Sequence, residues 1–443
     1  MTHPTFHEAL GFWVKLGFIN FGGPTGQIAV MHTELVERRK WISDGRFLHA
    51  LNYCMLLPGP EAQQLAVYLG WLLHRTPGGL VAGTFFILPS FFLMLLLSWV
   101  FVVHGDLPWI TALFGGLAAA VVGIVAAAAI RIGSRALKSP FLIAIAVAAF
   151  VAIFLLAVPF PFIVIGAALL GLVAKRLRWM PALDLPTADA EGHVLGDEHS
   201  PPDHALPSPA RTIRVLTVGV AVWLLPLVVV TQFLGNETIT QEAAFFSRLA
   251  LLTFGGAYAV LGYVNQAAVQ QFGWLSAGEM ATGLGLAETT PGPLIMVTQF
   301  VGFVAAYRFH GSLDPLVAGT LGSLVTVWAT FVPSFVFIFL GAPYVELLRG
   351  NRNLNAALSV ITAAVVGVIL SLAVTFAQTT LFDTVTTRHF LGNDLPVPDV
   401  TSIDLLAVTI AVFAFLGIWR FKWHIVPVVL GCGLAGLIVS LFD

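Results

Sequence analysis

Charged residues are scarce in this sequence of 443 residues. Lysine, arginine, aspartate and glutamate together make up 10% of the chain, whereas hydrophobic residues make up 58%. Because a soluble globular protein carries roughly a quarter charged residues, this composition predicts a polytopic membrane protein. The formal net charge of −2 gives no reason to expect a nucleic-acid partner.

Cysteine and known catalytic motifs are also scarce. Cys54 and Cys432 lie in apolar segments of different halves, which excludes a disulfide framework and favours simple packing. The chain has no HExxH zinc pair, GxSxG nucleophile turn, P-loop or dinucleotide fingerprint, so we expect no enzyme activity, cofactor, metal or ATP-driven step. His193, His199 and His204 lie scattered in a polar stretch, where we expect them to be solvated. The start of the chain shows no cleavable signal peptide.

Long apolar runs are abundant and predict an all-α fold. Runs near the length that crosses a bilayer as a helix occur at about 78–103, 109–130, 140–157 and 159–174, and again at 313–342, 354–378, 404–419 and 424–441. The polar, proline-rich residues 175–214 predict a linker, and residues 215–235 predict an extra spanning helix. We therefore divide the chain into an N-terminal repeat at 1–174, the linker, the extra helix and a C-terminal repeat at 236–443.

Proline and glycine interrupt two further apolar stretches. Pro-Gly-Pro turns occupy residues 58–60 and 291–293. Proline lacks the backbone N–H and clashes with the preceding turn, so each motif must break a helix. Inside a membrane, a broken helix is tolerated only where it is buried in protein or lines a polar cavity. The free N–H groups and positive dipole end of the helix that follows such a break favour a bound anion.

The two turns occupy matching positions of an internal duplication. A shift of 233 residues places residues 291–293 on 58–60 and the Phe-Gly-Gly segment at 254–256 on that at 21–23, without a gap. After a small insertion, Val-Pro-Ser-Phe from Val332 falls on Leu-Pro-Ser-Phe from Leu88. Such paired, interrupted segments are the best sequence pointer to the binding site of a transporter.

The distribution of lysine and arginine predicts that the two halves are inverted. Short cytoplasmic loops carry an excess of these residues, and Lys175, Arg176 and Arg178 place the linker in the cytoplasm. The extra helix at 215–235 then carries the second half to the opposite side. We expect inverted repeats whose broken helices meet near the membrane midplane.

Residues at and beside the breaks form the predicted substrate site. Glycines there allow close approach, with tight helix packing as the alternative, and amides or hydroxyls can donate to an oxyanion, with capping of free backbone groups as the alternative. Lys15 and Arg248 are equivalent under the 233-residue shift, and intramembrane charge is usually functional, although either residue can snorkel to the interface. The predicted substrate-binding residues are Lys15, Gly22, Gly23, Pro24, Thr25, Gln27, Pro58, Gly59, Pro60, Glu61, Gln63, Gln64, Arg248, Gly255, Gly256, Glu288, Thr289, Thr290, Pro291, Gly292 and Pro293.

The paired motifs resemble a known family. FGGPTGQIAVM with WISDGRFLHALNYCMLLPGPEAQQLAVYLGW, and FGGAYAVLGYV with GLGLAETTPGPLIMVTQFVGF, are similar to the long-chain branch of the chromate ion transporter superfamily. The resemblance covers nearly the whole chain. It implies a prokaryotic plasma-membrane protein of two homologous halves that exports chromate and lowers its toxicity. Ala257 stands where Pro24 stands in the first half, so the halves need not contribute equally.

The substrate and the driving force remain open at this stage. Chromate is a tetrahedral dianion close to sulfate in shape and charge, so sulfate or another oxyanion is an alternative substrate. An intramembrane enzyme acting on a phosphorylated lipid is an alternative of another class. The membrane potential is worth about 2.3 kcal/mol per charge per 100 mV, which favours potential-driven export of a dianion. Proton coupling through Glu61 or Glu288 is the alternative. The oligomeric state is undetermined, with a homodimer among the alternatives.

Overall fold

The protein is described here from a computed structural model, and seven ranges of the chain are described. They are residues 3–21, 23–105, 107–176, 207–254, 257–344, 352–390 and 393–441. Gly22, Gly255 and Gly256 of the predicted site lie outside the described residues, as do the three linker histidines.

Helices dominate the first half, as the apolar runs predict. Its elements are α1 (Phe6–Ile19), α2 (Gly23–His32), the π-helix η1 (Thr33–Arg38), α3 (Asp44–Leu56), α4 (Glu61–His104), α5 (Pro108–Ala136), α6 (Pro140–Phe154) and α7 (Phe160–Arg176). Local signals set the ends of these helices. The hydroxyl of Ser139 accepts from the backbone N–H of Leu142 at 3.3 Å, and Pro140 occupies the first position of α6.

The second half repeats this order. Its helices are α8 (Pro209–Leu234), α9 (Glu237–Leu252), α10 (Ala257–Asn265), the π-helix η3 (Gln266–Gln271), α11 (Ala277–Thr289), η4 (Leu294–Met296), α12 (Val297–Arg308), α13 (Pro315–Gly341), η5 (Ala342–Tyr344), α15 (Arg352–Thr380), η6 (Val400–Ser402), α16 (Leu405–Trp419) and α17 (Ile425–Ser440). The extra helix α8 begins at Pro209, earlier than the predicted residue 215, because proline favours the first helical position. Its first turns therefore include residues 209–214, which the sequence pattern assigns to the linker.

Helix α4 contains the boundary between two predicted apolar segments. His74 and Arg75 leave the helical region, and Arg75 has a positive φ of 55°. Pro77 follows this break and is compatible with the start of a new helical segment. The element therefore consists of a first piece that follows the turn at 58–60 and a long second piece.

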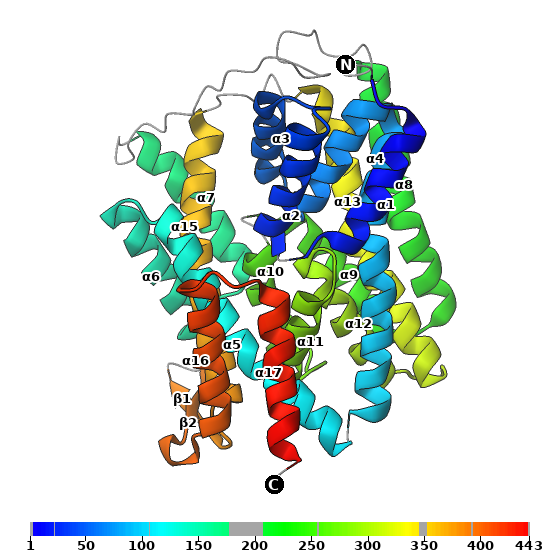
Figure 1. The fold of residues 1–443 in the computed structure, drawn as a ribbon. Coiled ribbons are helices and arrows are strands. Elements are labelled where there is room, and N and C mark those ends of the chain that lie inside the picture. Colours follow the sequence, from blue (N-terminus) through cyan, green and yellow to red (C-terminus); the bar gives the residue numbers. More distant parts are fainter. Residues whose placement is uncertain are drawn as a thin grey trace.

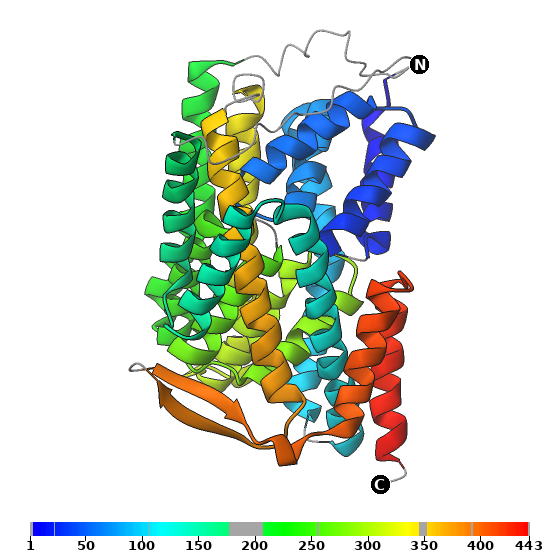
Figure 2. The ribbon, with the colours of Figure 1, turned by 90° about the vertical axis from the view of Figure 1, so that its left-hand side faces the viewer.

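One β-hairpin departs from the all-helical expectation. Strands β1 (Val385–Phe390) and β2 (Asn393–Pro398) pair antiparallel, with Val385 opposite Pro398. Figure 2 shows the hairpin, in orange, at one end of the molecule. The segment is too short and polar for the apolar-run criterion to detect it.

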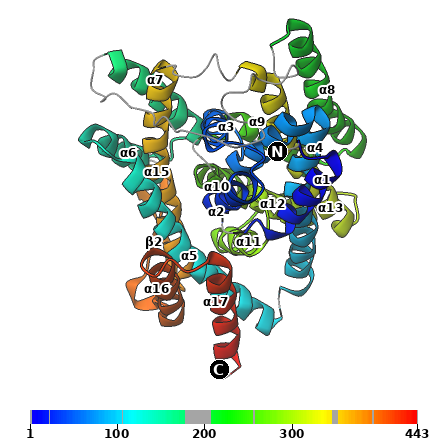
Figure 3. The ribbon, with the colours of Figure 1, turned by 45° about the horizontal axis from the view of Figure 1, so that its top comes forward.

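The helices are arranged in two lobes (Figure 3). The first lobe comprises α1–α4, α8, α9, α12 and α13, and the second lobe comprises α5–α7 and α15–α17. Helices α10 and α11 lie between them, because α10 packs against α15 and α11 packs against α5. Each half of the sequence therefore contributes its last three helices to the second lobe, and most of its other helices to the first.

Five described helices are long and apolar enough to cross a membrane, namely α4, α5, α8, α13 and α15. The repeat-equivalent helices α3 and α11 lie in the upper and lower parts of the molecule, respectively (Figure 1). This arrangement places the broken elements of the two halves toward different ends of the helical bundle.

In the second lobe, the last two helices of each half pack on a helix of the other half. Helices α6 and α7 of the first half pack on α15, while α16 and α17 of the second half pack on α5. A Cβ atom on Gly123 would clash with the carbonyl oxygen of Ala411, and one on Gly367 would clash with that of Ala146. These two contacts involve matching positions of the repeat, so glycine allows close helix contact at both.

Candidate functional site

The first Pro-Gly-Pro turn docks onto the second half of the chain. The backbone N–H of Gly59 donates to the carbonyl oxygen of Thr253 at 2.9 Å. Gly59 has φ +136°, a conformation that suits glycine. A Cβ atom at this position would lie 2.7 Å from the hydroxyl oxygen of Ser334 on α13. The turn is therefore held closely between its own half and the other.

The second turn makes the reciprocal contact with the first half. The backbone N–H of Gly292 donates to the carbonyl oxygen of Asn20 at 3.3 Å. Gly292 has φ +127°, and a Cβ atom there would lie 2.9 Å from the hydroxyl oxygen of Ser90 on α4. The hydroxyls of Ser90 and Thr290 lie 3.4 Å apart. Both turns are thus buried against the opposite half.

The partners of the turns are themselves repeat equivalents. Asn20 and Thr253 each lie one residue before Phe-Gly-Gly, and Ser90 and Ser334 occupy the matched Pro-Ser-Phe segments. The internal duplication aligns these segments, but it indicates no role for the four residues. The available signals were the shift of 233 residues between Asn20 and Thr253 and the shift of 244 residues between Ser90 and Ser334, but neither reveals which half supplies the partner.

Both turns lead directly into helices whose starts lack a side-chain cap. Helix α4 begins after Pro60, and η4 begins after Pro293. The first N–H groups of a helix have no partner within the helix, and the macrodipole gives this end positive character. An anion at these two starts, which the sequence suggests, stays a prediction.

We call the region where the two Pro-Gly-Pro turns dock on the opposite halves the crossing. Buried amide side chains surround this region. The amide nitrogen of Gln27 donates to the carbonyl oxygens of Asn20, at 3.1 Å, and of Gly292. The amide nitrogen of Gln64 donates to the carbonyl oxygen of Pro58 at 2.7 Å. These bonds brace both turns through side chains of the first half.

Several of these amides retain unused hydrogen-bonding capacity. The side chains of Asn20 and Gln63 are fully buried, and neither amide atom of either residue has a partner among the described residues. The amide oxygens of Gln27, Gln64 and Gln299 are likewise buried without a partner. An unsatisfied buried polar group costs about 1–3 kcal/mol. The amide nitrogens of Asn20 and Gln63 are therefore available as donors to an oxyanion ligand.

The predicted carboxylates differ in their surroundings. Glu288 is buried at the end of α11 and accepts a hydrogen bond from the hydroxyl of Tyr258 at 2.6 Å. Glu61 is half-buried and is the first residue of α4, directly after the first turn. An ionised carboxylate at either place would repel an anion.

The predicted threonines mainly satisfy nearby backbone groups. The hydroxyl of Thr289 donates to the carbonyl oxygen of Leu286 at 2.7 Å, and that of Thr290 donates to Ala287 at 3.0 Å. These bonds match the capping alternative. In α2, Gly23 is buried and Pro24 is half-buried. Thr25 follows them in the backbone of the same helix.

The structure does not bring Lys15 and Arg248 to the turns. Lys15 is exposed on the face of α1 that lies away from its buried residues Phe12 and Leu16. Arg248 is also exposed, and its Nε donates to the carbonyl oxygen of Ala244 at 3.1 Å. Long basic side chains in such positions extend toward the membrane interface.

We therefore expect Lys15→Met and Arg248→Met each to change the KM for transport by less than about twofold, because surface-exposed charges contribute little. Transport assays on the single variants and the double variant would check this. A loss of substrate binding at normal expression would instead support the cationic site that the sequence suggested.

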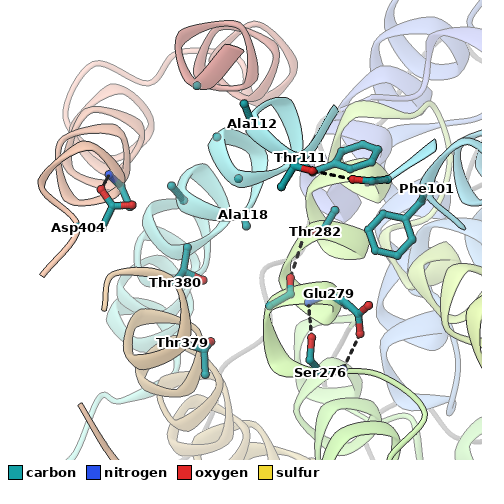
Figure 4. A pocket seen from close by; sticks show the side chains of 18 of the residues that line it. Phe101, Thr111, Ala112, Ala118, Ser276, Glu279, Thr282, Thr379, Thr380 and Asp404 are labelled. Atoms are coloured by element: carbon teal, nitrogen blue, oxygen red, sulfur yellow. Dashed lines mark hydrogen bonds between the residues drawn. The ribbon is translucent and has the colours of Figure 1, made fainter. Parts of the chain in front are cut away.

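A cavity of about 830 Å³ lies between the two lobes, near the start of α11. Figure 4 shows Thr379 and Asp404 of the second lobe on one side, and Phe101 and Glu279 on the other. Arg308 lines the same cavity and forms an ion pair with Glu279. None of the predicted site residues lines this cavity. Helix α11 links it to the second turn, because the helix begins at the cavity and ends beside residues 291–293.

Among the described residues, no group of three or more histidine, cysteine or acidic side chains is placed to hold a metal ion. Cys54 and Cys432 are both buried and unpaired as thiols. The geometry at the crossing therefore consists of helix starts, amides and hydroxyls. Groups of this kind can donate hydrogen bonds to the oxygens of an anion.

Comparison with known proteins identifies relatives of this chain. The chromate transporter family profile matches residues 8–172 and 240–437. A chromate transport protein of Pseudomonas aeruginosa is 31% identical over 98% of this chain and 92% of its own length. A chromate transport protein of Cupriavidus metallidurans is 29% identical over 86% of both chains, and a probable chromate transport protein of Synechococcus elongatus is 27% identical over 91% of this chain and 96% of its own. No solved structure shows significant similarity to the chain. Together with its long apolar helices and duplicated turns, these matches show that the chain is a multi-pass membrane protein belonging to the chromate transporter family.

Proposed function

We propose that this protein is a secondary transporter that exports chromate across the prokaryotic plasma membrane and thereby confers chromate resistance. The observation that supports this most strongly is the reciprocal docking of Gly59 and Gly292, each on the opposite half, beside unpaired buried amides. Two uncapped helix starts and the amides of Asn20 and Gln63 would together bind the oxyanion. Transport leaves the ion chemically unchanged.

The equivalent contacts that each half makes with the other also support an inverted arrangement of the halves. Asn20 and Thr253 accept equivalent hydrogen bonds from opposite turns, and glycines of α5 and α15 make equivalent contacts in the second lobe. Two inverted halves would present matching surfaces toward the two sides of the membrane, as alternating access requires. In this topology the linker faces the cytoplasm.

Sulfate is the second candidate substrate. The proposed donors at the crossing are neutral amides and backbone N–H groups, which recognise the oxygens of a tetrahedral dianion and not its central atom. Lys15 and Arg248 are exposed and add no charge-based selectivity at this site. Sulfate should therefore compete with chromate to a measurable degree.

Transport into everted membrane vesicles tests the direction. Everted vesicles carrying the protein should accumulate radiolabelled chromate when the membrane potential is imposed, because uptake there corresponds to export from the cell. Right-side-out vesicles should not. Vesicles lacking the protein provide the baseline.

The same assay separates the alternatives. Recovered label should still be chromate, and excess sulfate should reduce uptake. Uptake only by right-side-out vesicles would reverse the proposed direction. Release of phosphate from a lipid without ion movement would favour the intramembrane enzyme.

A further inference from the structure

One acidic residue outside the predicted site has its carboxyl group deep inside the protein. Glu242 of α9 is fully buried, and neither carboxyl oxygen has a hydrogen-bond partner within the described ranges. Helix α9 packs against α13, α12 and α8. One carboxyl oxygen of Glu242 lies 2.9 Å from where a Cβ atom on Gly322 would be, so the acid faces α13 directly.

Among the described residues of the surrounding helices, no cationic side chain is paired with this carboxyl. On α9, Glu237 and Arg248 are exposed near the two ends, and α13 carries no titratable residue. On α12, Tyr307 and Arg308 follow Ala306, which lies beside Gly322, and Arg308 pairs with Glu279. On α8, Arg211 and Arg214 lie in the first two turns. A buried carboxylate without a counter-charge is very costly, so Glu242 must carry a proton or a bound cation.

Buried hydroxyls continue from Glu242 along one face of α13. Three residues with hydroxyl groups follow Gly322 at intervals of four residues, namely Thr326, Thr330 and Ser334. This spacing places them on one side of the helix. The hydroxyls of Thr326 and Thr330 are buried without a partner in the described structure. Ser334 lies at the first turn, beside Gly59. The stripe therefore runs from the buried acid to the substrate site.

The matching face of the first half has no such stripe. Its equivalents on α4 are Gly78, Ala82, Phe86 and Ser90, and Ala9 stands where Glu242 stands. The two halves share the glycine and the serine but differ at the acid and at both threonines. Packing of the repeat therefore does not require the acid or the hydroxyls, which belong to one half only.

We propose that Glu242 is a proton-binding site and that Thr326, Thr330 and Ser334 form a proton pathway from it to the turn at Gly59. A hydroxyl both donates and accepts, so it can pass a proton onward. Four residues rise about 6 Å along a helix, so each step of the pathway would require one bridging water. The inference rests on the proposed transport function. It places proton coupling on Glu242 and not on Glu61 or Glu288.

Proteoliposomes containing the full chain can test this pathway. A gradient of radiolabelled chromate is imposed at a pH where chromate is the dianion, with the membrane potential clamped to zero. A pH electrode records proton movement, and the label records chromate. We expect the wild-type protein to move protons with chromate, and Glu242→Gln to lower the proton-to-chromate ratio at least tenfold. Thr330→Val should lower the rate of proton movement severalfold, because it interrupts the pathway without removing the acid.

Two matched variants serve as controls. Glu237→Gln changes an exposed acid of the same helix, and Thr320→Val changes a threonine of α13 outside the stripe. Both should keep the wild-type ratio. Chromate movement with an unchanged proton ratio in Glu242→Gln and an unchanged proton rate in Thr330→Val overturns the pathway. Sodium movement in place of protons also overturns it. Absence of chromate movement in the wild type would contradict the proposed function instead.

Discussion

Replacing Gly59 by leucine will abolish chromate transport while the protein still inserts into the membrane. The residue has φ +136°, where a side chain costs about 1–3 kcal/mol in backbone strain alone. Its Cβ atom would also meet the amide of Gln64 and lie 2.7 Å from the hydroxyl oxygen of Ser334. The turn would have to leave its place between the halves. We expect a loss of transport of at least a hundredfold.

The reciprocal position should behave in the same way. Gly292 has φ +127°, and a Cβ atom there would lie 2.9 Å from the hydroxyl oxygen of Ser90. If both turns form one site, Gly292→Leu should be as severe as Gly59→Leu. Strong loss from one substitution and near-normal transport from the other would show that only one half forms the site.

Gly11→Leu is a suitable control for both variants. Gly11 is exposed on α1, and a Cβ atom there has no neighbour within 4 Å. It should retain transport near the wild-type rate. The measurements are chromate flux in everted vesicles, together with the amount and melting temperature of purified protein. Loss of the protein from the membrane would identify a folding defect and not a defect in the site.

Replacing Gln63 should raise the KM for chromate by about tenfold to a hundredfold. A hydrogen bond to a charged group contributes roughly 1.5–3 kcal/mol, and 1.4 kcal/mol corresponds to tenfold. Gln63→Leu removes one donor to the oxyanion. Gln63→Glu should be more severe, because it places a carboxylate of the same shape at the proposed site of the dianion.

The stability of these variants separates a binding role from a structural one. Gln63 is fully buried with both amide atoms unpaired, so its polar group costs free energy in the absence of a ligand. Gln63→Leu should leave the melting temperature unchanged or raise it, while substrate affinity falls. Gln232→Glu, on the exposed surface of α8, is the control for an added charge. A lower melting temperature for Gln63→Leu with a normal KM would show that the amide is structural.

The lobed arrangement suggests how these sites work together. Both turns and Glu242 belong largely to the first lobe, while the cavity lined by Asp404 and Glu279 lies where the lobes meet. Movement of one lobe relative to the other would change access to the crossing without altering the hydrogen bonds that hold it. Helix α11, which joins the cavity to the second turn, lies on this boundary.

The sequence by itself determined the membrane class, the apolar helices, the duplication and the two breaks. These features depend on local chemistry, because apolar length sets a spanning helix and proline ends one wherever it stands. The hairpin formed by β1 and β2 was not predicted, because its strands are short and partly polar. The early start of α8 at Pro209 was missed because the apolar run begins after the helix does.

Only the tertiary structure decided which residues meet. Each turn docks on the half that does not contain it, and no periodicity within either half specifies that exchange. The structure left Lys15 and Arg248 on exposed faces and buried Asn20 at the crossing. It also aligned Glu242 with a hydroxyl stripe on α13, a helix more than seventy residues further along the chain. Helix packing joins distant segments through side-chain shape and small residues, so local sequence patterns predict the helices but not their partners.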